Sequence, residues 1–384
     1  MLHKVSIYHN ILWSKYKGVV FSKVYSRSVG GGLNVSFIQI AETEQQRVAL
    51  GNIDLSYHKY PYRLLFPGSF DSVPVGRRIL ALMRDVFKNP SDLVVIPGYE
   101  HIEYWGMLLV CMLLRRKRAV FCDSTINDRP RSYLLRELAK GFFFRRCDGF
   151  FCYGIRSKDY LLSYGVNEKR IIFRYQAAAL PHDYDRNEVL KEYRAIPSGE
   201  RESPTFLYVG RLSGEKGLED LLDGFKTVHA RVPTAKLNLV GAGSLKQKLI
   251  DRAKALGLET SVSFLGAMGM DEIARLFMRS TALVLPSHSE PWGLVVNESL
   301  SYGCPVVVSD ACGCVPELVL NGITGYSFPV GDVRALTDAL LDVRRLSADR
   351  VALAERCMDI IAGYSPDVAA SQILDGCQRM LEAT

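Results

Sequence analysis

The stretch Leu283-Val-Leu-Pro-Ser-His-Ser-Glu290-Pro-Trp-Gly-Leu-Val-Val-Asn-Glu298-Ser-Leu-Ser-Tyr-Gly-Cys-Pro305-Val-Val-Val-Ser-Asp310 reads as one strand–loop–helix–strand unit. The apolar runs at its two ends are short and rich in valine and leucine, which is typical of strands buried on both faces of a parallel sheet. Parallel neighbours need a crossover between them, usually a helix. This stretch therefore predicts an α/β fold.

The same alternation extends in both directions from this unit. Segments of helical period separate the short apolar runs; in Leu218–Val232, for example, Leu221, Leu222, Phe225 and Val228 share one face. Repeated strand–helix units of this kind indicate two Rossmann-like, doubly wound domains. The expected strands are Lys4–Tyr8, Asn34–Ile40, Asp92–Ile96, Arg118–Cys122, Gly149–Tyr153, Arg170–Tyr175, Thr205–Val209, Lys236–Val240, Val262–Leu265, Ala282–Leu285, Pro305–Ser309 and Gly325–Phe328.

A connector between the two domains is visible in residues 181–204, where Pro181, Pro197, Ser198, Gly199 and Pro204 stand among many charges. A short amphipathic helix is expected within it, at Glu188–Tyr193. We predict a first domain over 1–190, a linker over 191–204 and a second domain over 205–363. The last segment, 364–384, is expected to form one helix that returns to the first domain.

Composition places the chain among soluble globular proteins. Of its 384 residues 48% are apolar and 23% are charged, which excludes a disordered, collagenous or polytopic membrane protein. The start lacks the apolar core of a secretory signal. The longest apolar run, Trp105 to Leu114, is short of the roughly 20 residues that a membrane-spanning helix needs. The 9 cysteines show no disulfide spacing, so we expect a reducing, cytoplasmic setting.

Charge is unevenly distributed along the chain. Residues 1–200 carry 30 Lys+Arg against 19 Asp+Glu, whereas residues 201–384 carry 18 against 22. A basic first half predicts an anionic partner, such as a phosphate-bearing substrate, a membrane surface or nucleic acid. Arg115-Arg-Lys-Arg118 is the densest basic cluster. The alternative is a solvated basic face without any partner.

Two loops of the second half have the composition of phosphate-binding loops. The strand Thr205–Val209 is followed by Gly210, Arg211 and Lys216, and the strand Lys236–Val240 by Gly241 and Gly243. An arginine fork and a lysine point charge suit a diphosphate, and glycines let a ligand approach the backbone. The second loop is not a complete Gly-x-Gly-x-x-Gly, because position 246 is lysine; this disfavours a dinucleotide dehydrogenase.

The third loop is the opening stretch itself. Glu290 precedes Pro291, and the amides of Gly293 and Leu294 open a helix, where anions bind readily. Glu298 follows in the same helix. Carboxylates can accept hydrogen bonds from sugar hydroxyls, although both acids could also simply stabilise the helix start.

Together these segments resemble one known family. Gly-Arg-Leu-x-x-Glu-Lys-Gly, Val-Gly-x-Gly, Phe-Leu-Gly, Pro-Ser-x-x-Glu-Pro-Trp-Gly-Leu-Val-x-Asn-Glu, Gly-x-Pro-Val-Val-x-Ser and Gly-x-x-Pro-Glu-Leu-Val run from about Phe206 to Gly331. Their combination closely resembles the donor half of retaining GT-B glycosyltransferases of family 4, the glycosyl transferases of group 1. The first half of the chain resembles the family in architecture only.

The resemblance implies a set of roles. Arg211 and Lys216 would bind the donor diphosphate and stabilise the charge of the leaving nucleotide without a metal. Glu290 would hold hydroxyls of the transferred sugar, and Glu298 those of the nucleotide ribose. The other expected donor contacts are Gly210, Gly241, Gly243, Ala267, Met268, Trp292, Gly293 and Leu294. No cofactor is expected besides the nucleotide-diphosphate sugar.

The first half departs from the family pattern. The loop after its first strand, Asn10–Gly18, has one glycine where many members have several. Many members also carry a histidine at the end of a mid-domain strand, where this chain has Asp123. We expect Asp123 to take a catalytic part, and Lys15, Lys17 and His101 to contact the acceptor. Cys312 and Cys314 lack a second ligand pair with suitable spacing, so no metal site is expected.

These observations predict a retaining hexosyltransferase. The donor would be a UDP-sugar, with GDP-mannose as the next choice, and the acceptor a saccharide, lipid-linked at the cytoplasmic face of the membrane. The setting would be polysaccharide or glycoconjugate biosynthesis, with peripheral membrane contact through the basic half and no nucleic-acid partner. A nucleotide-sugar epimerase of the same fold and a non-catalytic nucleotide-sugar-binding subunit are the alternatives.

Overall fold

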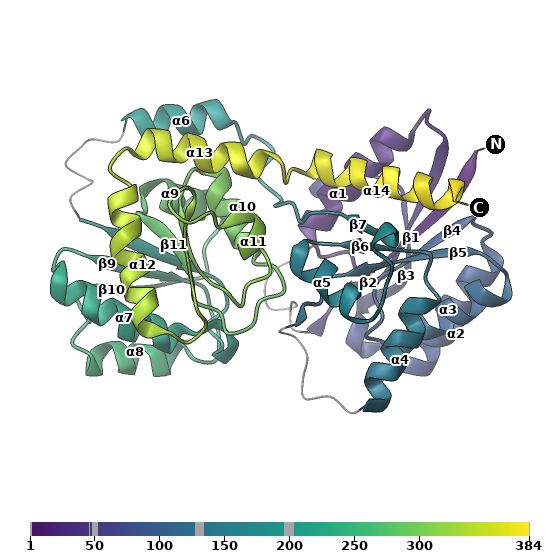
Figure 1. The fold of residues 1–384 in the computed structure, drawn as a ribbon, viewed down its shortest axis with the longest axis horizontal. Helices are drawn as coiled ribbons and strands as arrows, with labels where there is room; N and C mark the ends of the chain where they lie inside the picture. Colours follow the sequence, from purple (N-terminus) through teal and green to yellow (C-terminus); the bar gives the residue numbers. More distant parts are fainter. Residues whose placement is uncertain (1, 46, 48–52, 127–133, 196–202, 384) are drawn as a thin grey trace. The chain divides into compact units, whose positions relative to one another are not determined.

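The computed structural model describes residues 2–45, 47, 53–126, 134–195 and 203–383. The chain divides into two compact units, Met1–Ala179 with Ser365–Thr384, and Leu180–Tyr364 (Figure 1). Each unit is built on a parallel sheet with helices on both faces, so the predicted α/β class is confirmed. Among the described residues, no helix is both long enough and apolar enough to span a membrane.

The first unit contains a seven-stranded sheet in the order β3-β2-β1-β4-β5-β6-β7. The sequence reading missed β3, which contains Pro67 and Gly68; proline is tolerated there because β3 is an edge strand. The strands are β1 (His3–Ile11), β2 (Leu33–Thr43), β3 (Tyr62–Ser69), β4 (Leu93–Ile96), β5 (Lys117–Cys122), β6 (Gly149–Cys152) and β7 (Ile171–Phe173).

Two apolar cores lie on the two faces of this sheet. One face is covered by α2 (Val75–Lys88), α3 (Ile102–Leu113), α4 (Leu134–Arg145) and α5 (Ile155–Ser163). The other is covered by α1 (Lys15–Ser28) and α14 (Pro366–Glu382), which lie side by side (Figure 1). Gly376 of α14 allows this close packing, because a Cβ there would lie 2.6 Å from the ring of Phe151.

The second unit contains a six-stranded parallel sheet in the order β10-β9-β8-β11-β12-β13. Its strands are β8 (Thr205–Val209), β9 (Lys236–Val240), β10 (Val262–Gly266), β11 (Ala282–Leu285), β12 (Val306–Ser309) and β13 (Gly325–Phe328). Its helices are α6 (Arg186–Ala195), α7 (Leu218–Arg231), α8 (Lys246–Ala255), α9 (Met270–Arg279), α10 (Leu294–Ser301), α11 (Val315–Leu318), α12 (Val333–Leu346) and α13 (Arg350–Ala362). Short 3-10 turns occur at η2 (Leu55–Tyr57), η3 (Phe70–Ser72), η5 (Glu168–Arg170) and η7 (Gly214–Lys216).

The division between the units falls at Ala179–Leu180, earlier than the expected linker at 191–204. The helix expected at Glu188–Tyr193 is α6, and it belongs to the second unit because Tyr193 and Leu190 are buried there. The part of that linker over 196–202, with Pro197, Ser198 and Gly199, lies outside the described residues.

The strand orders locate the ligand-binding edge of each sheet. In a doubly wound sheet, ligands bind beyond the carboxyl ends of the strands, where the strand order reverses. That point lies between β1 and β4 in the first unit and between β8 and β11 in the second. The loops after these four strands are therefore where a site is expected.

Candidate functional site

In the second unit, the loops that follow β8 and β11 are joined by an ion pair at the switch point. Nζ of Lys216 donates to Oε2 of Glu290 at 2.5 Å, and the two side chains are 12% and 18% exposed. A partly buried ion pair is only weakly screened by solvent, so its charges act strongly on a bound group. The structure thus brings together two residues that are 74 positions apart in the sequence.

Arg211 lies in the same loop with half of its side chain exposed. Its guanidinium pairs with Glu215 at 2.9 Å, and the Ser213 hydroxyl donates to the same Glu215 oxygen at 2.7 Å. The Ser213 hydrogen bond is the main cause that lowers the pKa of Glu215. The sequence analysis gave Glu215 no role, although it is the acid of the quoted Gly-Arg-Leu-x-x-Glu-Lys-Gly motif. Glu215 orients Arg211 and leaves part of its guanidinium open to solvent.

The loops after β8, β9 and β10 lie against one another at this edge. Leu212 N donates to Ala242 O at 2.9 Å, and Gly241 N donates to Gly266 O at 2.7 Å. A Cβ at Gly241 would lie 1.8 Å from the Gly210 carbonyl oxygen, and one at Gly243 would lie 2.3 Å from the Leu212 carbonyl oxygen. These contacts require glycine. They also place the predicted residues Gly210, Gly241, Gly243, Ala267 and Met268 along one edge of the sheet.

The loop that contains Glu290 is fixed by the loop after β12. Gly313 N donates to Glu290 O at 2.9 Å, and Cys314 N donates to Trp292 O at 3.1 Å. Gly293 then adopts φ 98°, and α10 begins at Leu294. The Trp292 ring is buried and bonded through Nε1 to Asn297 at 2.8 Å, so its side chain belongs to the core. Only the backbone at Trp292, Gly293 and Leu294 is available to an anion at this helix start.

Glu298 lies on α10, one turn beyond that helix start. Burial raises its pKa to about 7.

Cys312 and Cys314 are both buried in the turn against the Glu290 loop. Within the described residues, no group of three or more His, Cys, Asp or Glu side chains is arranged to hold a metal ion.

The residues predicted in the first unit are more dispersed. Lys15 pairs with Asp54 at 3.2 Å, whereas Lys17, two positions later, is buried and donates to the Tyr153 hydroxyl at 2.6 Å. His101 stands immediately before α3, with its ring edge-on to Phe70 and Tyr104 at centroid distances of 5.1 and 5.3 Å. Through these ring contacts His101 packs against Phe70 and Tyr104.

Asp123 follows β5 and precedes Ser124, which lines a cavity of about 300 Å³ that the sequence motifs did not predict. The cavity is lined by Tyr99, Glu100, Trp105, Ser124, Arg136, Ala139, Lys140 and Tyr160. Tyr99 and Glu100 follow β4, and Ser124 follows β5. The cavity therefore lies beyond the carboxyl ends of these two strands. Burial and the nearby charge of Asp123 raise the pKa of Glu100 to about 7. A perturbed carboxyl in a cavity is typical of functional sites.

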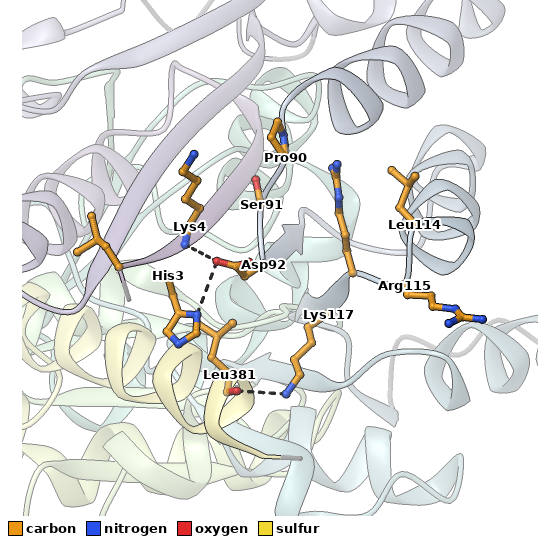
Figure 2. Close-up of a pocket in the computed structure, with 11 residues that line it drawn as sticks. His3, Lys4, Pro90, Ser91, Asp92, Leu114, Arg115, Lys117 and Leu381 are labelled. Atoms are coloured by element: carbon orange, nitrogen blue, oxygen red, sulfur yellow. Dashed lines mark hydrogen bonds and ion pairs between the residues drawn. The ribbon is translucent and has the colours of Figure 1, made fainter.

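A larger cavity of about 820 Å³ lies at the opposite edge, at the amino ends of β1, β4 and β5 (Figure 2). Figure 2 shows Lys117 reaching the Leu381 carbonyl of α14, and Asp92 accepting from the Lys4 amide at 2.8 Å. Arg116 and Arg118 likewise donate to backbone carbonyls. Arg116, Lys117 and Arg118 of the basic cluster therefore bond to backbone carbonyls within the first unit, and this cavity lies at the wrong edge for the predicted site.

The fold and the loops at its carboxyl edges define a GT-B protein. The family model "Glycosyl transferases group 1" matches residues 191–357, which include all the donor-site loops just described. The model thus matches most of the second unit, and the predicted resemblance to the glycosyl transferases of group 1 is confirmed for that unit.

Curated relatives match the same part of the chain. A glycogen synthase of Mycobacterium tuberculosis is 38% identical over 137 residues, covering 36% of this chain and 33% of the relative. A sulfoquinovosyl transferase of Arabidopsis thaliana is 35% identical over 158 residues, covering 40% and 29%. The match thus spans about a third of the length of these relatives.

Solved structures extend the likeness in fold to the whole chain. The structure of Anabaena HepE in complex with UDP-glucose has a TM-score of 0.71 and 17% identity, covering 98% of this chain and 100% of that chain. At this identity the likeness concerns the fold. The likeness in fold therefore includes the first unit, which the sequence motifs did not cover.

Proposed function

We propose that this chain is a retaining, metal-independent glycosyltransferase of family 4. It would transfer a hexose from a nucleotide-diphosphate sugar, with UDP-sugars favoured and GDP-mannose next, to a saccharide acceptor. The observation that carries this proposal is the Lys216–Glu290 pair at the β8/β11 switch point, beside Arg211 and the amino end of α10. HepE, which shares the fold, was solved with UDP-glucose.

The chemistry follows from the charges at this edge. Lys216 and Arg211 bind the donor diphosphate and stabilise the negative charge that develops on the departing nucleotide. Glu290 holds Lys216 in place and accepts hydrogen bonds from hydroxyls of the transferred sugar. The amides at the start of α10 add a positive dipole for the phosphate. In the front-face route proposed for this family, a donor phosphate oxygen takes the proton of the acceptor hydroxyl as the new glycosidic bond forms.

The acceptor is proposed to bind at the cavity of about 300 Å³ in the first unit. Tyr99 and Trp105 offer aromatic surface for a sugar ring, and Glu100, Ser124 and Lys140 offer hydrogen-bonding groups. Asp123, which follows β5, is the proposed catalytic residue on this side. His101 and Lys15 remain proposed acceptor contacts, although neither lines this cavity.

Membrane contact is proposed through the exposed sides of α2, α3 and α4, each of which carries large exposed apolar side chains. They are Val75, Leu80, Phe87, Ile102, Leu109, Leu113, Leu135, Leu138 and Phe142, and in α4 the last three share one face of the helix. Exposed cations stand among them, namely Arg77, Arg84, Lys88, Arg136, Arg145 and Arg146. Apolar residues flanked by cations are typical of helices that lie on an anionic membrane surface. This surface supports a lipid-linked acceptor.

The donor proposal is tested with nucleotides. A ligand that binds the native state raises the melting temperature, so one of UDP, GDP or ADP should stabilise the chain, and Arg211→Ala and Lys216→Ala should abolish the shift. The matched control is Arg345→Ala, which removes an exposed arginine of α12 that pairs with Asp342. Absence of any shift would count against a donor site.

The transfer step is tested by incubating the donor sugar with and without saccharide acceptors. A new glycosidic product that requires the acceptor, and keeps the anomeric configuration of the donor, is the expected result. An epimerised nucleotide sugar formed without acceptor would instead establish the epimerase alternative. Glu290→Ala should reduce transfer by at least about tenfold, the loss of one strong charge-assisted contact.

A further inference from the structure

Two cationic side chains are buried together in the first unit. Lys17, in the first turn of α1, is 3% exposed, and Arg174, the residue after β7, is 0% exposed. Nζ of Lys17 lies 4.5 Å from the Phe121 ring centroid and 4.9 Å from that of Tyr153. The guanidinium carbon of Arg174 lies 5.6 and 5.0 Å from the same two centroids. Two like charges thus share one aromatic-walled site.

Among the described residues, the guanidinium of Arg174 has no hydrogen-bonding partner. Lys17 donates to the Tyr153 hydroxyl at 2.6 Å, but Nε, Nη1 and Nη2 of Arg174 are all buried without an acceptor within the part of the chain that the structure describes. Buried polar groups in proteins are nearly always hydrogen-bonded, and leaving a charged one unsatisfied is costly. Contact with the two rings offsets part of that cost but supplies no acceptor along the N–H directions.

Among the described residues, positive charge outweighs negative charge around Lys17. Burial and then the charge of Arg174 lower the pKa of Lys17, and Asp123 is the acid that opposes this shift. Burial and then the charge of Lys17 lower the pKa of His9, which lies on β1 nearby. Lys17, Phe121, Tyr153 and Arg174 stand in or after α1, β5, β6 and β7, at the carboxyl edge of the sheet, where doubly wound proteins bind ligands.

We propose that Lys17 and Arg174 form a binding site for a phosphoryl group in the first unit. The planar guanidinium would donate two parallel hydrogen bonds to phosphate oxygens, and the lysine ammonium would supply a point charge. Ser14, which precedes α1, makes no side-chain bond to the first-turn amides, so these remain available to the same anion. The assignment of this phosphoryl group to the acceptor, as a sugar phosphate or a lipid phosphate, rests on the proposed function.

The test measures phosphate binding at a site separate from the donor loops. The full chain carrying both Arg211→Ala and Lys216→Ala is heated with increasing inorganic phosphate, and with chloride at equal ionic strength. We expect phosphate to raise the melting temperature in this background, and added Arg174→Met or Lys17→Met to weaken the apparent affinity at least about tenfold. Added Lys59→Met, which removes an exposed lysine of the same unit, should leave the phosphate response unchanged.

Stability without phosphate separates binding from a packing role. If the two cations serve only to pack against the rings, Arg174→Met should lower the melting temperature in chloride. If Arg174 awaits an anion, the methionine relieves an uncompensated buried charge, and the melting temperature should stay the same or rise. A phosphate response that Arg174→Met and Lys17→Met both leave intact, or no response at all, would overturn the proposal. UDP binding by the unmodified chain tests the donor site independently.

Two further ligands identify the source of the phosphoryl group. Glucose 6-phosphate and dihexanoyl phosphatidic acid are titrated as in the phosphate experiment, with glucose and dihexanoyl phosphatidylcholine as their controls. A stronger, Arg174-dependent shift with the sugar phosphate assigns the site to a phosphorylated saccharide. A stronger shift with the phosphatidic acid assigns it to a lipid headgroup.

Discussion

The protonation state of the Glu298 carboxyl is set by its surroundings. Glu298 lies on α10, and removal of its side chain from solvent raises its pKa from 4.5 to about 7. Between these two values the folded chain keeps a proton on Glu298 that the unfolded chain has released. The free energy of unfolding should therefore fall as the pH rises through this window, by at most about 1.4 kcal/mol for each pH unit.

This pH dependence can be measured by urea unfolding at pH 5, 6 and 7. In Glu298→Gln the side chain cannot ionise, so the variant should lose less stability than the parent chain across this range. Parallel curves for the two proteins would show that Glu298 does not titrate there.

The same residue gives a prediction about ligand binding. An ionised carboxylate accepts hydrogen bonds from ribose hydroxyls better than a protonated one. If Glu298 contacts the ribose, UDP should bind more tightly at pH 8 than at pH 6 in the parent chain, as calorimetry would report. The gain should disappear in Glu298→Gln.

At the scale of elements, the donor edge depends on loops that pack backbone against backbone. A Cβ at Gly241 would lie 1.8 Å from the Gly210 carbonyl oxygen, and Gly241 also has φ 136°. Gly241→Ala should therefore separate the loops after β8 and β9, destabilise the chain by about 2 kcal/mol or more, and weaken nucleotide binding.

Gly257→Ala is the matched control for this substitution. Gly257 also has a positive φ, of 72°, but a Cβ there would meet nothing within 4 Å. Gly257→Ala should lower the free energy of unfolding only by the backbone strain, about 1 kcal/mol, and leave nucleotide binding unchanged. Equal losses in the two variants, measured by urea unfolding, would mean that the close approach of the loops is unimportant.

At the scale of the whole molecule, the end of the chain completes the first unit. Ile373 of α14 is fully buried in the core that α14 and α1 form on one face of the first sheet. Ile373→Ala should lower the free energy of unfolding of this unit by about 2–5 kcal/mol, whereas Gln378→Ala, exposed on the same helix, should change it little. Protease sensitivity of α14 in the two variants provides the measurement.

The proposed membrane surface makes a second prediction at this scale. The chain should float with vesicles that contain anionic lipid and float less with neutral ones. Leu135→Ser combined with Leu138→Ser should weaken this binding at least about tenfold, since each leucine contributes about 1.5–3 kcal/mol when buried. Leu265→Ser, a substitution at an exposed leucine of the second unit, is the control. Absence from both kinds of vesicle would remove the membrane part of the proposal.

Local patterns predicted much of this fold because strand and helix periods are properties of neighbouring residues. The expected strands at Thr205–Val209, Lys236–Val240 and Ala282–Leu285 have the observed bounds. The strand β3 was missed because Pro67 and Gly68 weaken its local signal, and its pairing with β2 outweighs that weakness. The motifs pointed to Lys216 and Glu290 but not to their contact, because a hydrogen bond between residues 74 positions apart leaves no local trace. The role of Glu215 was missed although its partners Arg211 and Ser213 are close to it in the sequence.

The sequence by itself determined the α/β class, the two-domain plan and the family of the second unit, because these depend on periodicity and on short motifs within single loops. Tertiary structure alone decided which distant side chains meet: Lys17 and Arg174 at two shared aromatic rings, and Glu100 within reach of the charge of Asp123. It also showed that Arg116–Arg118 bond to backbone carbonyls. The physical reason is that burial and the field of neighbouring charges depend on where the strands end in space, and strand order, unlike strand period, is set by contacts between residues far apart in the chain.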